Sequence, residues 1–283
     1  MRPLRDVVGE YKKAGKALGH FNFSDSNQLK AIAGAAKETG LPVIAGLSEG
    51  ERAFFPLSHA VPLVKAYQAE GAQVYLNADH TYSVELVQRA ISAGVDSVVV
   101  DGAKLPFDEN REMLAACVKY ARAAGRDVLV EGELGYIGTS SKSLESLPEG
   151  VSFENLTTPE DAKKFVEATD VDALAPAVGN IHGMLKNAPE PRLHPERVKE
   201  ITAAVSVPLV LHGASGNSEE DVRACIKAGV SLIHINTELR VLYRDALRAS
   251  LRSEETTPYK FLTPAVEQMK QFVVQKIKLF ANP

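Results

Sequence analysis

The chain has 283 residues, of which 45% are hydrophobic and 24% charged, with 20 glycines and 15 prolines. These ordinary globular proportions exclude a disordered or collagen-like chain, and the length suits an α/β barrel, which commonly uses about 200 to 250 residues as one domain. The net charge is -4 with acidic and basic residues interspersed, so no basic run predicts a nucleic-acid partner.

The chain begins with MRPLRDVVGEYKKAGK, which predicts a charged amphipathic helix and not a signal peptide. No apolar run approaches the ~20 residues needed to cross a bilayer. Cys117 and Cys225 fall in predicted amphipathic helices without metal-ligand spacing, so we expect reduced packing cysteines. These features predict a cytoplasmic protein without a membrane partner.

Eight short apolar runs alternate with longer stretches of helical periodicity. In chain order the runs cover residues 17–23, 42–48, 73–79, 97–102, 127–133, 173–179, 208–213 and 232–236. Eight strand-helix units favour an α/β fold in which residues 1–283 form one (β/α)8 TIM-barrel domain. An open doubly wound sheet is the alternative. An additional C-terminal helix is expected over residues 263–281, packed on the barrel exterior or on a partner subunit.

Polar residues collect at the carboxyl ends of the predicted strands. In a TIM barrel these ends share one face, where the loops build the active site. The residues at these ends are Asn22, Ser48, Asp79, His80, Asp101, Glu131, Glu133, His182, His212, Asn236 and Thr237. His80, His182 and His212 come from three different units, and three imidazoles with an open fourth position are typical of a catalytic zinc site.

The other histidines lack this pattern. His20 lies inside the first predicted strand and is expected to be structural. His59 and His194 fall in polar, proline-flanked segments and are expected to be surface loop residues.

Carboxylates accompany the predicted metal ligands. Asp79, next to His80, could orient that ligand or transfer a proton to a substrate held on the metal. Asp101 and Glu133 could bind a second divalent or monovalent cation or hydrogen-bond the histidines. Helix caps or loop carboxylates are the alternative for both.

Glycine-containing turns after the last two strands predict a phosphate site. HGASG at 212–216 follows the seventh strand, and INTELR at 235–240 follows the eighth. Loops at these places commonly hold phosphate with backbone N–H groups and a helix N-terminus. Gly183 and Lys186 could add donors, although Lys186 could equally be a solvated loop lysine. A metal beside a phosphate site predicts a phosphorylated hydroxyketone, a metal-stabilised enediolate and reversible C–C cleavage.

Order and spacing are shared with a known family along nearly the whole chain, from GHFNFSDSNQLKAI through PVIAGLSEG, ADHTYSVELVQRAISAGVDSVVVDGAKLPFDEN, VEGELGYIG, AVGNIHGMLK and LVLHGASG to INTELR. On these segments the chain resembles the class II, metal-dependent, fructose- and tagatose-bisphosphate aldolases. The resemblance implies a catalytic zinc ion on the three histidines, with Asp79 as proton donor at the aldehyde-derived hydroxyl. Asp101 and Glu133 match positions that can hold a second or displaced metal ion. The residues expected to bind the substrate are Asn22, Ser48, Gly183, Lys186, Gly213, Ala214, Ser215, His234, Asn236 and Thr237.

The chain departs from the family pattern near the predicted metal ligands. The family's HxDH reads NADH at 77–80, without its first histidine, and its DGS reads DGA at 101–103. His234 stands where the family has a substrate-binding asparagine. It could hydrogen-bond the enediolate or simply fill the strand end.

A further departure falls on the loop after the fifth strand. The family's loop acid, credited with moving the proton at the nucleophilic carbon, is replaced by TSSK at 139–142, and Ser141 cannot act as a carboxylate base. Glu145 or Glu149 on the same loop could swing in to replace it.

Three functions therefore fit the sequence. The first is a zinc-dependent aldolase that cleaves fructose 1,6-bisphosphate to dihydroxyacetone phosphate and glyceraldehyde 3-phosphate. The second is an aldolase for tagatose bisphosphate or a deoxy-sugar acid. The third is a metal- and sugar-phosphate-binding protein without turnover. A homodimer is expected, because closed two-fold assemblies are the commonest oligomers.

Overall fold

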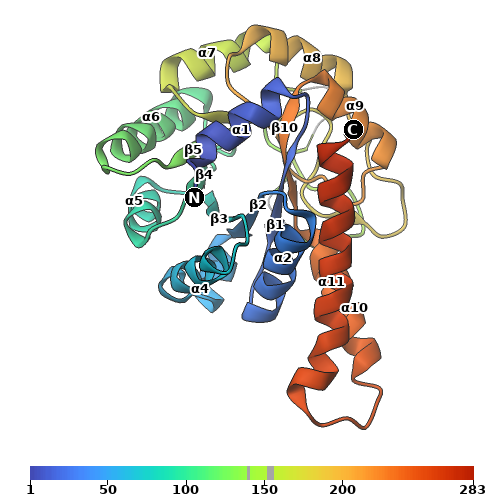
Figure 1. Cartoon of the computed structure of the whole chain (residues 1–283). Coiled ribbons are helices and arrows are strands. Elements are labelled where there is room, and N and C mark those ends of the chain that lie inside the picture. Colours follow the sequence, from blue (N-terminus) through green and yellow to red (C-terminus); the bar gives the residue numbers. More distant parts are fainter. Residues whose placement is uncertain (139–140, 152–155) are drawn as a thin grey trace.

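The computed structural model describes residues 1–138, 141–151 and 156–283. Eight parallel strands close into a barrel in the order β1-β10-β9-β7-β5-β4-β3-β2 (Figure 1). Their bounds are β1 (Leu18–Asn22), β2 (Val43–Leu47), β3 (Val74–Thr81), β4 (Ser97–Val100), β5 (Leu129–Leu134), β7 (Ala173–Pro176), β9 (Leu209–Leu211) and β10 (Val230–Ile235). The closed barrel is confirmed, and the open sheet is wrong because β1 pairs with β10 and leaves no free edge.

Helices surround the barrel and connect its strands. They are α1 (Leu4–Lys13), α2 (Ser26–Thr39), α3 (Glu49–Phe54), α4 (Leu57–Ala69), α5 (Val84–Ala93), α6 (Phe107–Ala123), α7 (Pro159–Thr169), α8 (Pro195–Ala204), α9 (Glu219–Ala228), α10 (Thr237–Ser250) and α11 (Pro258–Ala281). Polar caps begin several of them: the Asp25 side chain accepts the N–H groups of Asn27 and Gln28 at α2, which satisfies donors that have no partner within the helix.

Several predicted boundaries were wrong. β7 ends at Pro176, its last ladder pair with β5, and not at residue 179; the chain then turns at Gly179, which has a φ of 98°. β3 continues to Thr81 beyond the predicted end at 79. α11 begins at Pro258 and not at 263, since proline is well suited to a first helical position.

Two of the predicted surface histidines have different surroundings from those expected. His59 is exposed but lies in α4 and not in a loop. His194 is half-buried and caps the start of α8.

Helix α1 closes the amino end of the barrel, across which it lies in Figure 1. Its Leu4, Val7 and Val8 pack with residues from the amino ends of the strands, among them Leu18 and Leu232. The carboxyl end is therefore the end left open for a site. α11 packs against α2 and α10, so its predicted position on the barrel exterior is confirmed, and the α10–α11 pair extends beyond the barrel.

A separate two-stranded parallel sheet lies beyond the barrel. It joins β6 (Ser143–Leu144), in the segment after β5, to β8 (Met184–Leu185), in the segment after β7. In the described parts of the chain, no helix combines the length and apolar character of a membrane span.

Candidate metal and active site

A bulge at the end of β3 places Asp79 and His80 in the same site. Consecutive residues of a regular strand point to opposite faces of the sheet. Here the register with β4 shifts between Ala78 and Thr81, and His80 has a φ of 40°, in the left-handed region. His80 Nε2 consequently lies 3.7 Å from Asp79 Oδ1, because a bulge redirects a side chain.

The three predicted histidine ligands come together at the carboxyl end of the barrel. Ring centroids are separated by 4.6 Å for His80 and His182, 5.0 Å for His80 and His212, and 5.8 Å for His182 and His212. Glu133 Oε1 lies between two of them, 2.9 Å from His80 Nδ1 and 3.2 Å from His212 Nδ1. The four side chains offer ligand atoms that all lie within 4.8 Å of one another.

The donor set of this group fits a divalent cation. Among the described residues, His182 Nε2 is buried and has no hydrogen-bond partner. Buried polar atoms without a partner are uncommon and require an explanation such as a bound ion. Three imidazoles and one carboxylate are ligands that zinc accepts. Burial lowers the pKa of His182 to about 3, so its ring is neutral and has a lone pair for a metal.

Two other carboxylates contact the candidate ligands His80 and His212. Asp101 Oδ2 lies 3.0 Å from His80 Nδ1, and Glu131 Oε1 lies 2.5 Å from His212 Nε2. Burial alone would raise the pKa of Glu131, but the neighbouring His234 and His212 lower it to about 2. Glu131 is therefore ionised and can accept a hydrogen bond from His212 Nε2. This bond fixes the orientation of the His212 ring.

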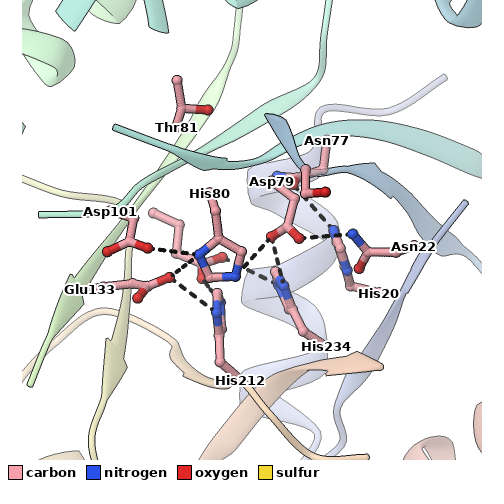
Figure 2. Close-up of polar contacts among 12 residues, drawn as sticks. His20, Asn22, Asn77, Asp79, His80, Thr81, Asp101, Glu133, His212 and His234 are labelled. Carbon is pink, nitrogen blue, oxygen red and sulfur yellow. Dashed lines mark hydrogen bonds and ion pairs between the residues drawn. The ribbon is translucent and has the colours of Figure 1, made fainter. Parts of the chain in front are cut away.

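Asp79 is buried beside the metal group. Its Oδ2 accepts a hydrogen bond of 2.9 Å from Asn22 Nδ2, and its Oδ1 lies 3.5 Å from His234 Nδ1 (Figure 2). Burial would raise the pKa of Asp79, but the charge of His80 and the contact with His234 hold it well below the usual range. The carboxylate is therefore ionised and held in one position.

His234 is the middle ring of three stacked imidazoles. It stacks on His20 at 3.6 Å with an angle of 6°, and on His212 at 4.1 Å with an angle of 23°. His20, which the sequence predicted to be structural, in turn contacts Asn77 Oδ1 through Nε2 at 3.2 Å. His20, Asp79 and His234 lie close enough to suggest a second metal site. The nearly parallel rings argue against it, because lone pairs in parallel ring planes do not converge on one ion.

The predicted phosphate-binding turns lie at the same end of the barrel. Gly183 and Gly213 have φ values of 105° and 58°, conformations that glycine adopts without strain. A side chain at Gly213 would place its Cβ 2.0 Å from the carbonyl oxygen of Ile181, so the two loops touch. Ser215 Oγ accepts the N–H groups of Asn236 at 3.4 Å and Glu238 at 3.3 Å, which joins the turn to the start of α10.

A cavity of about 170 Å³ opens over the metal group. It is lined by Ser48, Glu49, Gly50, His80, Tyr82, Ser141, His182 and Arg240. Arg240 was not predicted; it pairs with the buried Glu51 at 2.5 Å and donates to the Ser141 carbonyl.

Lys186, predicted to bind substrate, is directed elsewhere. Its Nζ pairs with Glu145 Oε1 at 2.5 Å, and both side chains are exposed. Glu149 is exposed as well. Residues 139 and 140 of the substituted TSSK segment lie outside the described residues, whereas Ser141 lines the cavity.

The sequence pattern of the family described as "Fructose-bisphosphate aldolase class-II" matches residues 2–282. The chain belongs to this family. It is 35% identical to the "Probable fructose-bisphosphate aldolase" of Bacillus subtilis over 285 residues, which cover 99% of this chain and 97% of that protein. It is 34% identical to the "Fructose-bisphosphate aldolase" of Staphylococcus epidermidis over 289 residues, or 99% and 96% of the two chains.

Solved structures agree with this assignment. The YdjI aldolase of Escherichia coli K12 superposes with a TM-score of 0.83 at 29% identity, covering 98% of this chain and 96% of that one. A putative fructose-1,6-biphosphate aldolase of Coccidioides immitis gives a TM-score of 0.85 at 26% identity with the same coverage. As a class II aldolase the chain belongs to a family of metal-dependent lyases.

Two of the residues at which this class II aldolase departs from the family pattern are linked through His20. Asn77 stands where the HxDH motif has its first histidine, and its Nδ2 donates to Ser97 Oγ at 2.7 Å while its Oδ1 contacts His20. His20 stacks on His234, which is a second departure. The two changes therefore belong to one packed cluster beside Asp79.

Proposed function

We propose that the chain is a zinc-dependent ketose-bisphosphate aldolase that reversibly cleaves fructose 1,6-bisphosphate to dihydroxyacetone phosphate and glyceraldehyde 3-phosphate. The observation that carries this proposal is the convergence of His80, His182, His212 and Glu133 beside the buried Asp79. These four residues would hold the ion, which as a Lewis acid would polarise the substrate carbonyl.

Asp79 is the group that exchanges the hydroxyl proton. In the direction of cleavage its ionised carboxylate accepts the proton of the C4 hydroxyl as the C3–C4 bond breaks, and in the direction of synthesis it returns that proton. Asn22 holds the carboxylate from one side through a hydrogen bond of 2.9 Å, so the oxygen facing His234 is the one available to the substrate.

The phosphate of the ketone end would lie at the turns after β7, β9 and β10. The N-terminus of α10 and the backbone N–H groups around Gly183 and Gly213 favour a dianion there. Ser215 holds the second turn against α10.

The proton at the nucleophilic carbon requires another group. Glu145 and Glu149 are exposed on the loop after β5 and are two carboxylates that could supply it, with water as the alternative. The ion pair between Glu145 and Lys186 is exposed and therefore weak enough to exchange.

A coupled assay for triose phosphate on zinc-loaded protein tests the proposal. Asp79→Ala is expected to lower kcat by ~10² to 10⁴, the scale of one acid–base group, while zinc remains bound. Asp108→Ala, at an exposed position, serves as the control. The absence of triose phosphate from any ketose bisphosphate would refute the lyase function.

The same assay separates the alternatives. Comparing kcat/KM for fructose and tagatose bisphosphates, which differ at C4, decides between those two substrates. The substituted TSSK segment favours a second candidate function, a binding protein without turnover. That function predicts that calorimetry detects sugar-phosphate binding without cleavage.

A further inference from the structure

Arg52 lies next to the bulge at the end of β3, and the mechanism proposed above gives it no role. It is in α3, and its guanidinium faces the end of β3. One terminal nitrogen donates to the carbonyl oxygens of Leu47 and of Asp79, the latter at 2.8 Å. The other donates to Thr81 Oγ1 at 3.1 Å and reaches the His80 carbonyl oxygen at 3.5 Å. The guanidinium therefore contacts all three residues of the bulge.

These contacts meet a specific need of the backbone. His80 has a φ of 40°, a conformation that a residue with a Cβ disfavours and that persists only where its surroundings enforce it. The bulge also disrupts the regular hydrogen bonding between β3 and β4, because the register shifts between Ala78 and Thr81. A guanidinium supplies several N–H donors in one rigid plane, which a lysine ammonium cannot reproduce.

The start of α3 places Arg52 against the bulge. Ser48 and Glu51 form a capping box, in which the Glu51 carboxylate accepts the Ser48 N–H at 2.8 Å. Glu51 is itself held by Asn22 at 2.9 Å and by Arg240 at 2.5 Å. Because the first turn of α3 is fixed at Glu51, the next residue has a defined position against β3.

We propose that Arg52 is a positioning residue that holds His80 in its left-handed conformation and thereby directs the His80 ring and the Asp79 carboxylate into one site. Without the guanidinium, residue 80 relaxes toward negative φ and its ring turns away from His182 and His212. This inference rests on the proposed function, since it takes those side chains to bind a metal ion and move a proton.

Arg52→Lys and Arg52→Met test the proposal. Lysine keeps the charge, and methionine keeps an apolar stem without it. We expect both variants to weaken zinc binding by roughly 10- to 100-fold, the range for groups that orient metal ligands, measured by competition with a chromogenic chelator. We also expect kcat to fall more than KM changes, and the absorption spectrum of the cobalt-substituted protein to change. Arg89→Met is the matched control, because Arg89 is an exposed arginine of the neighbouring α5 whose ion pair is with Glu85 of its own helix.

Chemical rescue separates positioning from general stabilisation. Arg52→Ala removes the guanidinium, and guanidinium chloride at millimolar concentration, far below denaturing levels, is expected to restore zinc affinity and kcat in part. Thermal unfolding of the metal-free variants checks that they fold. If Arg52→Ala does not fold, the zinc affinity and kcat of Arg52→Lys test the proposal instead.

Two results would overturn the proposal. One is a zinc affinity and a kcat in folded Arg52→Lys and Arg52→Met equal to those of the wild type. The other is a loss in folded Arg52→Ala that guanidinium does not reverse. A wild-type protein that binds zinc but cleaves no ketose bisphosphate would refute the proposed function alone, because the zinc affinities still decide the role of Arg52.

Discussion

Glu131→Gln isolates the orientation of one metal ligand. Glu131 Oε1 lies 2.5 Å from His212 Nε2, and both side chains are buried. The substitution keeps the shape of the side chain and removes its charge. His212 Nδ1, which faces Glu133, would keep its direct contacts. Any change in metal affinity would therefore come from the altered contact at His212 Nε2, on the opposite side of the ring.

The geometry of the contact gives the expected magnitude. Glu131 is buried and ionised, and its carboxylate holds the Nε2 side of the His212 ring at 2.5 Å. Glu131 has a longer contact with His234, whose Nε2 lies 3.6 Å from Glu131 Oε2. We therefore expect zinc binding to weaken by roughly 10- to 100-fold, or ~1.4 to 2.8 kcal/mol.

Chelator competition at constant pH measures this change directly. Asp96→Asn is a suitable control, because Asp96 is a half-buried carboxylate at the amino end of β4 that accepts the Leu76 N–H at 2.8 Å. Wild-type zinc affinity in folded Glu131→Gln would show that Glu131 does not orient His212, and the reasoning would fail.

Two further predictions concern stability. Gly213→Ala is expected to lower the free energy of unfolding by ~2 to 4 kcal/mol, because it combines positive φ with a contact of 2.0 Å to the Ile181 carbonyl oxygen. Gly125→Ala, with a φ of 67° and open space around its Cβ, should lose only ~1 kcal/mol; equal losses in urea unfolding would contradict the steric argument. Burial raises the pKa of Cys117 and Cys225 to about 12, whereas the unfolded thiols ionise near pH 9. Stability should therefore fall as pH rises from 9 toward 12, by at most ~1.4 kcal/mol per cysteine per pH unit, and an unchanged slope in the double alanine variant would assign the loss to other groups.

The barrel was predictable because its signal is local. Each strand is a short apolar run bounded by a turn, and eight such runs can be counted without knowing their partners. Strand ends were less predictable, since an apolar run can continue past the last ladder pair of its strand, as residues 177–179 do after β7. α3 was missed although its capping box, Ser48 and Glu51, is visible in the sequence.

The convergence of the three histidines was predictable because barrel closure brings all strand carboxyl ends together. The contacts of His20, His234 and Arg52 around this site were not predictable. His20 and His234 stack because β1 pairs with β10 in the register that places these two residues side by side, and a sequence alone does not give the register between its first and last strands. Arg52 had no signal either, since its partners are backbone carbonyl groups that every residue possesses.

The small β6–β8 sheet makes one loop dependent on another. Lys142 and Leu144 provide carbonyl oxygens for the N–H groups of Met184 and Lys186, and the His182 N–H donates to Ile137. Backbone hydrogen bonds therefore hold the segment after β5 at Ile137 and again at Lys142 and Leu144, close to His182 in the sequence. A displacement that carried Glu145 toward the cavity would either pull β8 and the nearby His182 along or first break these backbone bonds. Movement of this loop would therefore be coupled to the position of His182.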